Sequence, residues 1–253
     1  MDISTALSIL PDHKAPEGLS DRYMFLDTKQ VIKDMADLGF AIAGFRRPET
    51  RTARGPYGVH EIDFRRPEDI SRPKGEAPRI LFINSYDGTR RAQLVSGVIR
   101  FICSNGLVTG DLLESKKFLH IGNYADELIK QIQESAKTAS RVFESIEKWK
   151  EIKLDEGTYL QMAEQAAKLR YPNDEVLVEP SMILQPRRRD DLAQDLFTQW
   201  NVIQENLVRG GIPGAWRNGQ ERTISQVKNI EKSNKLNAQL WKLGEEFADL
   251  ATH

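Results

Sequence analysis

The pattern of apolar and polar positions predicts strands in the first half of the chain. Short apolar runs at 40–45 and 79–85 are bounded by turn residues, and the second run is apolar enough to be buried on both faces. Between them, residues 60–65 alternate apolar and charged, which is the period of a strand with one buried face. At 27–39, apolar residues at helical spacing between a capping Asp27 and a closing glycine predict a short helix.

An Asp-Gly turn at 87–88 is followed by apolar positions at 92–102, which we expect to form a buried helix. From residue 123 the pattern changes to long amphipathic helices. They are predicted at about 128–149, 156–170, 190–209 and 220–250. The predicted fold class is α+β: a small antiparallel sheet with a buried helix, followed by a long-helix C-terminal half.

Three parts are expected along the chain. Residues 1–20 are mixed and contain proline, which predicts a flexible N-terminal arm. Residues 21–122 carry the predicted strands and form an α+β core domain, and residues 123–253 form a helical region packing on that core.

Composition narrows the class of protein. The chain has 253 residues, a net charge of −1 and one cysteine, Cys103, which favours a reducing compartment. Its apolar runs are much shorter than the roughly 18–20 residues that cross a bilayer, and its first residues lack a basic signal segment. We therefore expect a cytoplasmic protein with no membrane contact.

Positive charge is concentrated in the middle of the chain. Between Ala41 and His120 there are 14 lysines and arginines against 9 acids, and many of the arginines come in pairs. Arginine suits phosphate because its planar guanidinium donates two parallel hydrogen bonds, although solvated surface arginines would give the same pattern. The candidate nucleic-acid contacts are Arg46, Arg47, Arg51, Arg54, Arg65, Arg66, Arg90, Arg91, Lys116 and Lys117.

The turn at 84–91 is a second candidate. Gly88 lets backbone amides approach an anion, Asn84 and Asp87 can fix the turn through side-chain bonds, and Arg90-Arg91 stand at the start of the expected helix. This arrangement predicts either a phosphate site or a purely structural turn.

Catalytic chemistry has little support in the sequence. The four histidines are far apart, a single cysteine excludes a zinc cluster, and nucleophile or phosphate-loop motifs are absent. Asp87, Glu114 and Lys116 are the remaining alternative, a magnesium nuclease site of the E-x-K kind. We assign no catalytic residue, no metal and no cofactor, and a non-enzymatic protein is favoured over an enzyme.

The stretch NSYDGTRRAQLVSGVIRFICSNGLV, which includes Asn84, Asp87, Gly88, Asn105 and Gly106, carries a family resemblance. Further motifs are SDRYMFLDT at 20–28, Gln185-Pro-Arg-Arg, QENLVRGG at 204–211 and LNAQLW at 236–241. Together they resemble the phage/plasmid-like protein family of unknown function, the YfjQ/YafZ-like proteins borne by prophages and plasmids. Tyr86 stands where that family usually has histidine.

The resemblance implies a role in a mobile genetic element. The order of elements is also similar to that of ring-forming single-strand annealing proteins, a likeness at the level of fold alone. The first hypothesis is therefore a DNA-binding accessory protein, a homo-oligomer that binds or anneals single strands in recombination or replication. The alternatives are a protein-binding factor that inhibits a host defence system or host enzyme, and the magnesium nuclease.

Overall fold

The structure is a computed structural model that describes residues 7–8, 10–13, 19, 25–47, 55–70, 76–90, 92–100, 106–108, 130, 134, 141–142, 144–173 and 175–252. The chain forms two compact units. The first unit comprises residues 1–106 and 110–140, and the second unit comprises residues 107–109 and 141–253. Among the described residues, no helix combines the length and apolarity that crossing a membrane requires.

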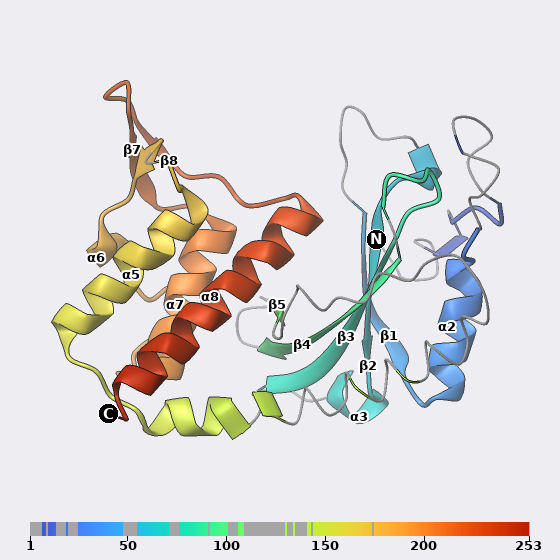
Figure 1. Cartoon of the computed structure of the whole chain (residues 1–253), viewed down its shortest axis with the longest axis horizontal. Coiled ribbons are helices and arrows are strands. Elements are labelled where there is room, and N and C mark those ends of the chain that lie inside the picture. The colour runs from blue at the N-terminus through green and yellow to red at the C-terminus, as the bar shows by residue number, and fades with distance from the viewer. Residues whose placement is uncertain are drawn as a thin grey trace. The chain divides into compact units, whose positions relative to one another are not determined.

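The first unit is built on the antiparallel strands β1 to β4, which belong to a sheet of order β1-β2-β3-β4-β5 (Figure 1). The strands are β1 (Ala41–Arg46), β2 (His60–Arg65), β3 (Glu76–Asn84), β4 (Gln93–Arg100) and β5 (Gly106–Val108). The described helices are α2 (Thr28–Asp37), the single turn α3 (Pro67–Ile70) and the 3-10 turn η1 (Gly55–Tyr57). The predicted α+β class is confirmed.

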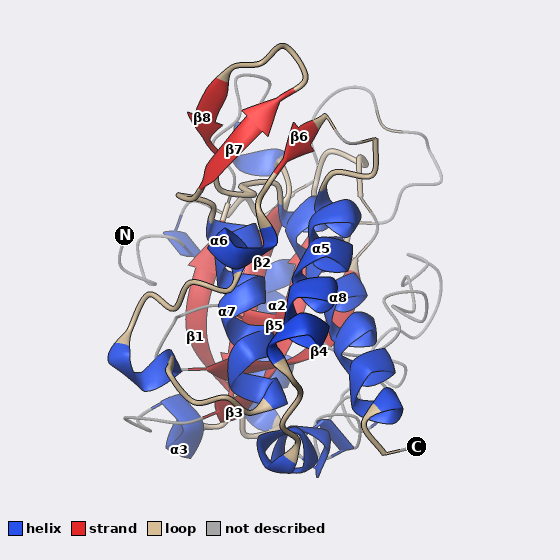
Figure 2. Ribbon diagram, turned by 90° about the vertical axis from the view of Figure 1, so that its left-hand side faces the viewer, coloured by secondary structure: helices blue, strands red, loops and turns tan. Residues whose placement is uncertain are grey.

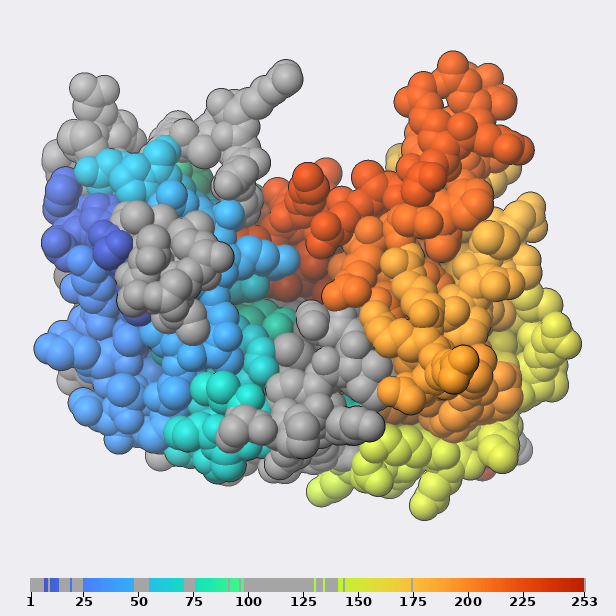
Figure 3. Space-filling view, turned by 180° about the vertical axis from the view of Figure 1, so that it is seen from behind, coloured from blue at the N-terminus to red at the C-terminus, as the bar shows by residue number. Residues whose placement is uncertain are grey.

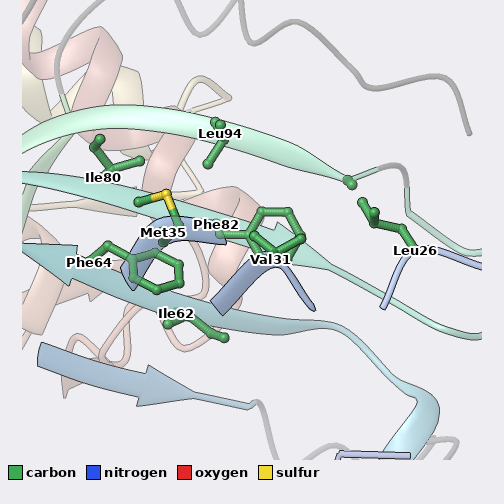
Figure 4. Close-up of a cluster of buried hydrophobic side chains, with 9 residues drawn as sticks. Leu26, Val31, Met35, Ile62, Phe64, Ile80, Phe82 and Leu94 are labelled. Atoms are coloured by element: carbon green, nitrogen blue, oxygen red, sulfur yellow. The ribbon is translucent and has the colours of Figure 1, made fainter. Parts of the chain in front are cut away.

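Helix α2 lies on one face of this sheet and encloses the core of the first unit (Figure 4). Asp27 caps the helix as predicted, because its carboxylate accepts a hydrogen bond from the Lys29 amide. Alternate residues of β2 and β3 point to α2, so that each strand contributes every second side chain. The buried cluster consists of Leu26, Val31, Met35, Ile62, Phe64, Ile80, Phe82, Ala92 and Leu94.

The helix predicted at 92–102 is wrong over the part that the structure describes. Residues 93–100 form strand β4, which pairs with β3 from Ile83↔Gln93 to Glu76↔Arg100. The periodicity of a short apolar run does not distinguish a helix from a strand. Here the adjacent turn and the free backbone edge that β3 offers for pairing favour a hairpin over a helix.

Strand β2 also differs from its prediction. All six of its residues are buried, including the charged positions Glu61, Asp63 and Arg65 that the alternation assigned to solvent. The alternation therefore separates an apolar face from a charged face that is also buried. A period of two residues shows which side chains share a face of the strand, but it does not show whether that face is exposed to solvent.

The second unit combines helices with a small antiparallel sheet of order β6-β7-β8 (Figure 2). Residues 144–151 are helical, and the strands are β6 (Val176–Leu177), β7 (Pro213–Trp216) and β8 (Glu221–Thr223). The helices are α5 (Glu156–Arg170), α6 (Pro180–Ile183), α7 (Leu196–Arg209) and α8 (Ile230–Leu250), with a 3-10 turn η3 (Arg189–Asp191).

Helix boundaries follow the caps in the second unit. The prediction at 156–170 matches α5, whereas α7 and α8 begin later than predicted, after the N-caps Asp195 and Asn229. Strand β7 lies between the helices predicted at 190–209 and 220–250, and β8 lies at the start of the second of these predicted helices.

Helix α7 is the centre of the second unit, since every residue from Leu196 to Val208 is buried. Beside it, Trp149, Trp200 and Trp241 form an aromatic cluster with ring centroids 4.3 to 6.0 Å apart. Gly244 on α8 makes room for this cluster, because a Cβ atom there would lie 2.4 Å from the Trp149 ring.

Candidate functional site

The motif turn after β3 is anchored by Asn84, which is fully buried. Its side-chain amide donates to the Leu26 carbonyl at 3.0 Å and to the Thr28 hydroxyl at 3.1 Å, while its oxygen accepts from the Ser85 amide at 2.8 Å. The turn is thereby fastened to the segment that leads into α2. The motifs at 20–28 and 84–89 thus meet in the structure.

His60, the first residue of β2, completes this buried polar cluster. Its Nε2 lies 2.8 Å from the Thr28 hydroxyl and its Nδ1 lies 3.3 Å from the Gly58 carbonyl. The Thr28 amide donates to the Tyr86 hydroxyl at 3.0 Å. Burial is the main cause that lowers the pKa of His60 from 6.5 to about 4; the hydrogen bond with Gly58 opposes this shift and the nearby Arg47 charge adds to it. The imidazole is therefore neutral at pH 7.

The turn itself uses its own polar groups. Asp87 accepts from the Thr89 amide at 3.0 Å, and the Ser85 hydroxyl accepts from the Arg90 amide at 3.0 Å. The predicted side-chain fixing by Asn84 and Asp87 is confirmed. The helix expected after this turn is wrong, because strand β4 follows it, so a helix N-terminus does not contribute here, and both of these amides already have acceptors.

The other face of the sheet carries a row of ion pairs. Arg46 lies 3.1 Å from Glu61, Arg65 lies 2.6 Å from Asp63, and Arg79 lies 3.4 Å from the same Asp63 carboxylate. Arg79 was not predicted as a site residue, although a single arginine inside the apolar strand RILFIN is the signal that could have indicated it. Asp63 is thus shared by two guanidiniums.

Three arginine nitrogens in the described part of this unit are buried without a hydrogen-bond acceptor: Arg46 Nε, Arg47 Nη1 and Arg79 Nε. Arg46 Nε forms an ion pair with Glu61 but without hydrogen-bond geometry, and the Arg46 side chain remains 40% exposed. A buried donor without an acceptor is costly and needs an explanation. Arg46 and Arg47 close the end of the edge strand β1.

The remaining predicted contacts are dispersed. Arg66 donates to the Leu38 carbonyl at 2.8 Å, closing the end of α2, and its guanidinium lies 4.2 Å above the Phe40 ring. Arg65 is buried in its ion pair with Asp63, and Arg90 is exposed at the turn. Gly106 begins β5. Arg51, Arg54, Arg91, Asn105, Lys116 and Lys117 lie outside the described residues.

In the second unit, three motifs that are distant in sequence meet around α7. Arg188 pairs with the buried Glu205 through both guanidinium nitrogens. Arg187 donates to the Asn206 side chain at 2.6 Å, and Asn206 in turn donates to the Ile183 carbonyl at 2.8 Å.

The third motif joins from α8. Gln204 donates to the Asn237 side chain at 2.7 Å, and Asn237 donates to the Ser233 carbonyl at 2.9 Å. These side chains satisfy one another, which indicates that the three motifs stabilise the fold of this unit.

The described residues contain no group of three His, Cys, Asp or Glu side chains placed to hold a metal ion. Of the alternative nuclease site, Asp87 is used in the turn, and Glu114 and Lys116 lie outside the described residues.

Comparison with known proteins places these motifs in a family. The model for the domain of unknown function DUF932 matches residues 17–241, so the chain belongs to this family. Among curated proteins, the UPF0380 proteins YafZ and YfjQ of Escherichia coli (strain K12) are each 31% identical over 232 residues. Each alignment covers 90% of this chain and 84% of the relative. No solved structure matches the chain significantly.

Proposed function

We propose that this protein binds single-stranded nucleic acid as a non-catalytic accessory protein of a phage or plasmid, acting in recombination or replication in the bacterial cytoplasm. The observation that carries the proposal is the arginine pair at the end of β1. Arg46 Nε and Arg47 Nη1 are adjacent in sequence, buried, and without hydrogen-bond acceptors. Phosphate oxygens are the acceptors that fit two such guanidiniums.

Charge in this part of the sheet supports an anionic ligand. Along the charged face, the described side chains comprise three guanidiniums, Arg46, Arg65 and Arg79, against the carboxylates of Glu61 and Asp63, an excess of 3 − 2 = +1. Arg47 adds a further positive charge next to His60, whose own pKa it lowers. A positive charge without a counter-charge attracts an anion more strongly when it lies next to the protein interior, where the dielectric constant is low, than when it is surrounded by water.

The test is fluorescence anisotropy of labelled single- and double-stranded oligonucleotides of equal length, at about 50 and 200 mM salt. The variant is Arg47→Gln, and Lys33→Gln on the exposed side of α2 is the matched control with the same loss of charge. We expect the single strand to bind more tightly than the duplex. Arg47→Gln should weaken it several-fold and reduce the salt slope by about 1, while Lys33→Gln changes little.

Two outcomes would overturn the proposal. One is the absence of binding to either oligonucleotide at about 50 mM salt, where phosphate contacts are strongest. The other is an equal effect of Arg47→Gln and Lys33→Gln, which would show that only overall charge matters. A host protein that copurifies with a chain unable to bind nucleic acid would then support the protein-binding alternative.

A further inference from the structure

The β7–β8 hairpin of the second unit projects from the helices of that unit (Figure 3). Its loop, residues 217–220, is closed by hydrogen bonds from the Trp216 amide to the Gln220 carbonyl at 2.9 Å and from the Gly219 amide to the Trp216 carbonyl at 2.8 Å. Gly219 has φ +75°, a conformation that glycine adopts without strain. Residues 217–223 are all exposed.

The register assigns the side chains of the hairpin to two faces. Val176 is opposite Trp216, and Gly214 is opposite Arg222, so Trp216 and Arg222 share one face. Glu221 is opposite Ala215 and therefore belongs to the other face. The acid of the hairpin is thus separated from its tryptophan.

The shared face changes in character from base to tip. At its base, Gly214 lets the chain pass close to the side chains of Val176 and Ile224, because a Cβ atom there would lie 2.8 to 2.9 Å from their methyl groups. Trp216 is nearer the tip and partly exposed, and the guanidinium of Arg222, from the position opposite Gly214, lies over its ring at 5.9 Å from the centre. The apolar base holds the strands, and beyond it the hairpin presents an aromatic ring with a cation over it.

Arg217 adds a second cation next to Trp216. Its guanidinium donates to the Asn173 carbonyl, which holds the side chain against that residue. Glu175 accepts a hydrogen bond from the Asn173 amide at 3.1 Å. Residues 213–223 contain two arginines and one glutamate, and the glutamate lies on the opposite face.

We propose that the Trp216 face of this hairpin is a base-stacking subsite for single-stranded nucleic acid, with a nucleobase on the indole and a flanking phosphate on Arg222. The choice of ligand rests on the proposed function. An indole with flanking guanidiniums suits an unpaired base and its phosphate, since every base has a π-face and every linkage a negative charge. A duplex keeps its base faces stacked and does not offer them to Trp216.

Intrinsic fluorescence makes this subsite testable in the intact protein. The chain has four tryptophans, and Trp149, Trp200 and Trp241 are at most 4% exposed. Stacking of a base on Trp216 should therefore quench the accessible part of the emission. The probes are an oligothymidylate and an abasic oligonucleotide of the same length and charge.

For the wild-type chain we expect thymidylate to quench and to bind about 5- to 150-fold more tightly than the abasic strand, the range that stacking of one base gives. Trp216→Phe should reduce this preference and abolish the quenching, and Trp216→Ala should remove both. Arg222→Gln should weaken both probes, and Glu221→Gln on the opposite face should leave the preference unchanged.

The outcomes separate this subsite from the proposed function. If the wild-type chain binds thymidylate and abasic strands equally while Arg47→Gln still weakens both, the subsite is wrong and nucleic-acid binding stands. If neither probe binds, the proposed function fails and the subsite with it. A thymidylate preference that persists in a folded Trp216→Ala protein would also overturn the subsite, and should that variant not fold, the Arg222→Gln result decides.

Discussion

The Thr28 hydroxyl lies 2.8 Å from Nε2 of His60, joining the first residue of α2 to the first residue of β2. Because Nδ1 faces the Gly58 carbonyl, the ring proton belongs on Nδ1, and Nε2 accepts from the threonine. The Asn84 amide then donates to the same threonine oxygen. A neutral histidine is therefore built into the junction between helix, sheet and turn.

This junction predicts a loss of stability in mild acid. The pKa of His60 is about 4 in the folded protein and 6.5 in the unfolded chain, so the unfolded state binds the proton first as pH falls. Above about pH 7, His60 is neutral in both the folded and the unfolded state, so it should not lower the free energy of unfolding. This free energy should fall between pH 6.5 and 4, by about 3 kcal/mol in all.

Urea unfolding from pH 5 to 7.5 measures this effect in a window where most carboxylates stay ionised. His60→Gln should flatten the profile in that window. His13→Gln, at an exposed histidine, is the control and should leave it unchanged. A wild-type profile without slope between pH 5 and 6.5 would contradict the prediction.

Tyr86→Phe removes one oxygen from the same cluster. The Thr28 amide then loses its acceptor at 3.0 Å inside the protein, which should lower the free energy of unfolding by about 1–3 kcal/mol. Tyr57→Phe is the control, since its hydroxyl makes an exposed contact with His13 and should cost no more than about 0.5 kcal/mol. Equal midpoints for the two variants in chemical denaturation would argue against the role given to Tyr86.

In the second unit, Glu205→Gln should be strongly destabilising. The Glu205 side chain is 3% exposed and accepts from Arg188 and Arg209, so the substitution removes a buried carboxylate that both guanidiniums share, although Arg188 keeps its ion pair with Asp191. We expect a loss of about 2–4 kcal/mol, reduced from the fully buried case because Arg188 is 26% exposed.

The exposed pair of Glu164 and Lys168 provides the contrast. Glu164→Gln should cost only about 0.3–0.5 kcal/mol. A double-mutant cycle of Arg188 and Glu205 isolates the coupling between them. A coupling below about 0.5 kcal/mol would show that the pair is not the feature that stabilises this region.

Gly244→Ala should destabilise the protein although alanine is the better helix former by about 1 kcal/mol. The new methyl group would lie 2.4 Å from the Trp149 ring and 2.9 Å from Trp200, so the aromatic cluster must move, at a net cost of about 1–3 kcal/mol. Lys242→Ala on the exposed side of α8 should be nearly neutral. Near-ultraviolet circular dichroism and denaturant midpoints measure both effects, and a stabilised Gly244→Ala protein would contradict the packing described.

Much of the fold follows from local sequence rules. Asp27 caps α2 as its position predicts, and the apolar run before Asn84 forms a buried strand. Residues 93–100 could not be assigned in this way, because a short apolar run fits helix and strand equally, and pairing with β3 decided between them. The β7–β8 hairpin was missed although Asn218-Gly219 is a turn signal, because β8 was included in the helix predicted at 220–250.

The candidate site was less accessible to sequence analysis. Clustered arginines indicate a basic surface, but Arg65 and Arg66 are committed to an ion pair and to a helix end, contacts that depend on register. Arg79 interrupts an apolar run, but its partner Asp63 became known only from the strand pairing that brings the two together. Sequence gives the charges along a strand, whereas the acceptors available to each charge depend on the neighbouring strands.

The complete enclosure of α7 has a consequence for protein synthesis. Part of its buried surface reaches its partners only when α8 has been made, because Trp200 donates to the Leu240 carbonyl and Gln204 to Asn237. A nascent chain that has reached residue 229 therefore carries a helix whose apolar surface has no cover from α8. During translation this segment is a natural target for chaperones and for aggregation, until the last helix leaves the ribosome.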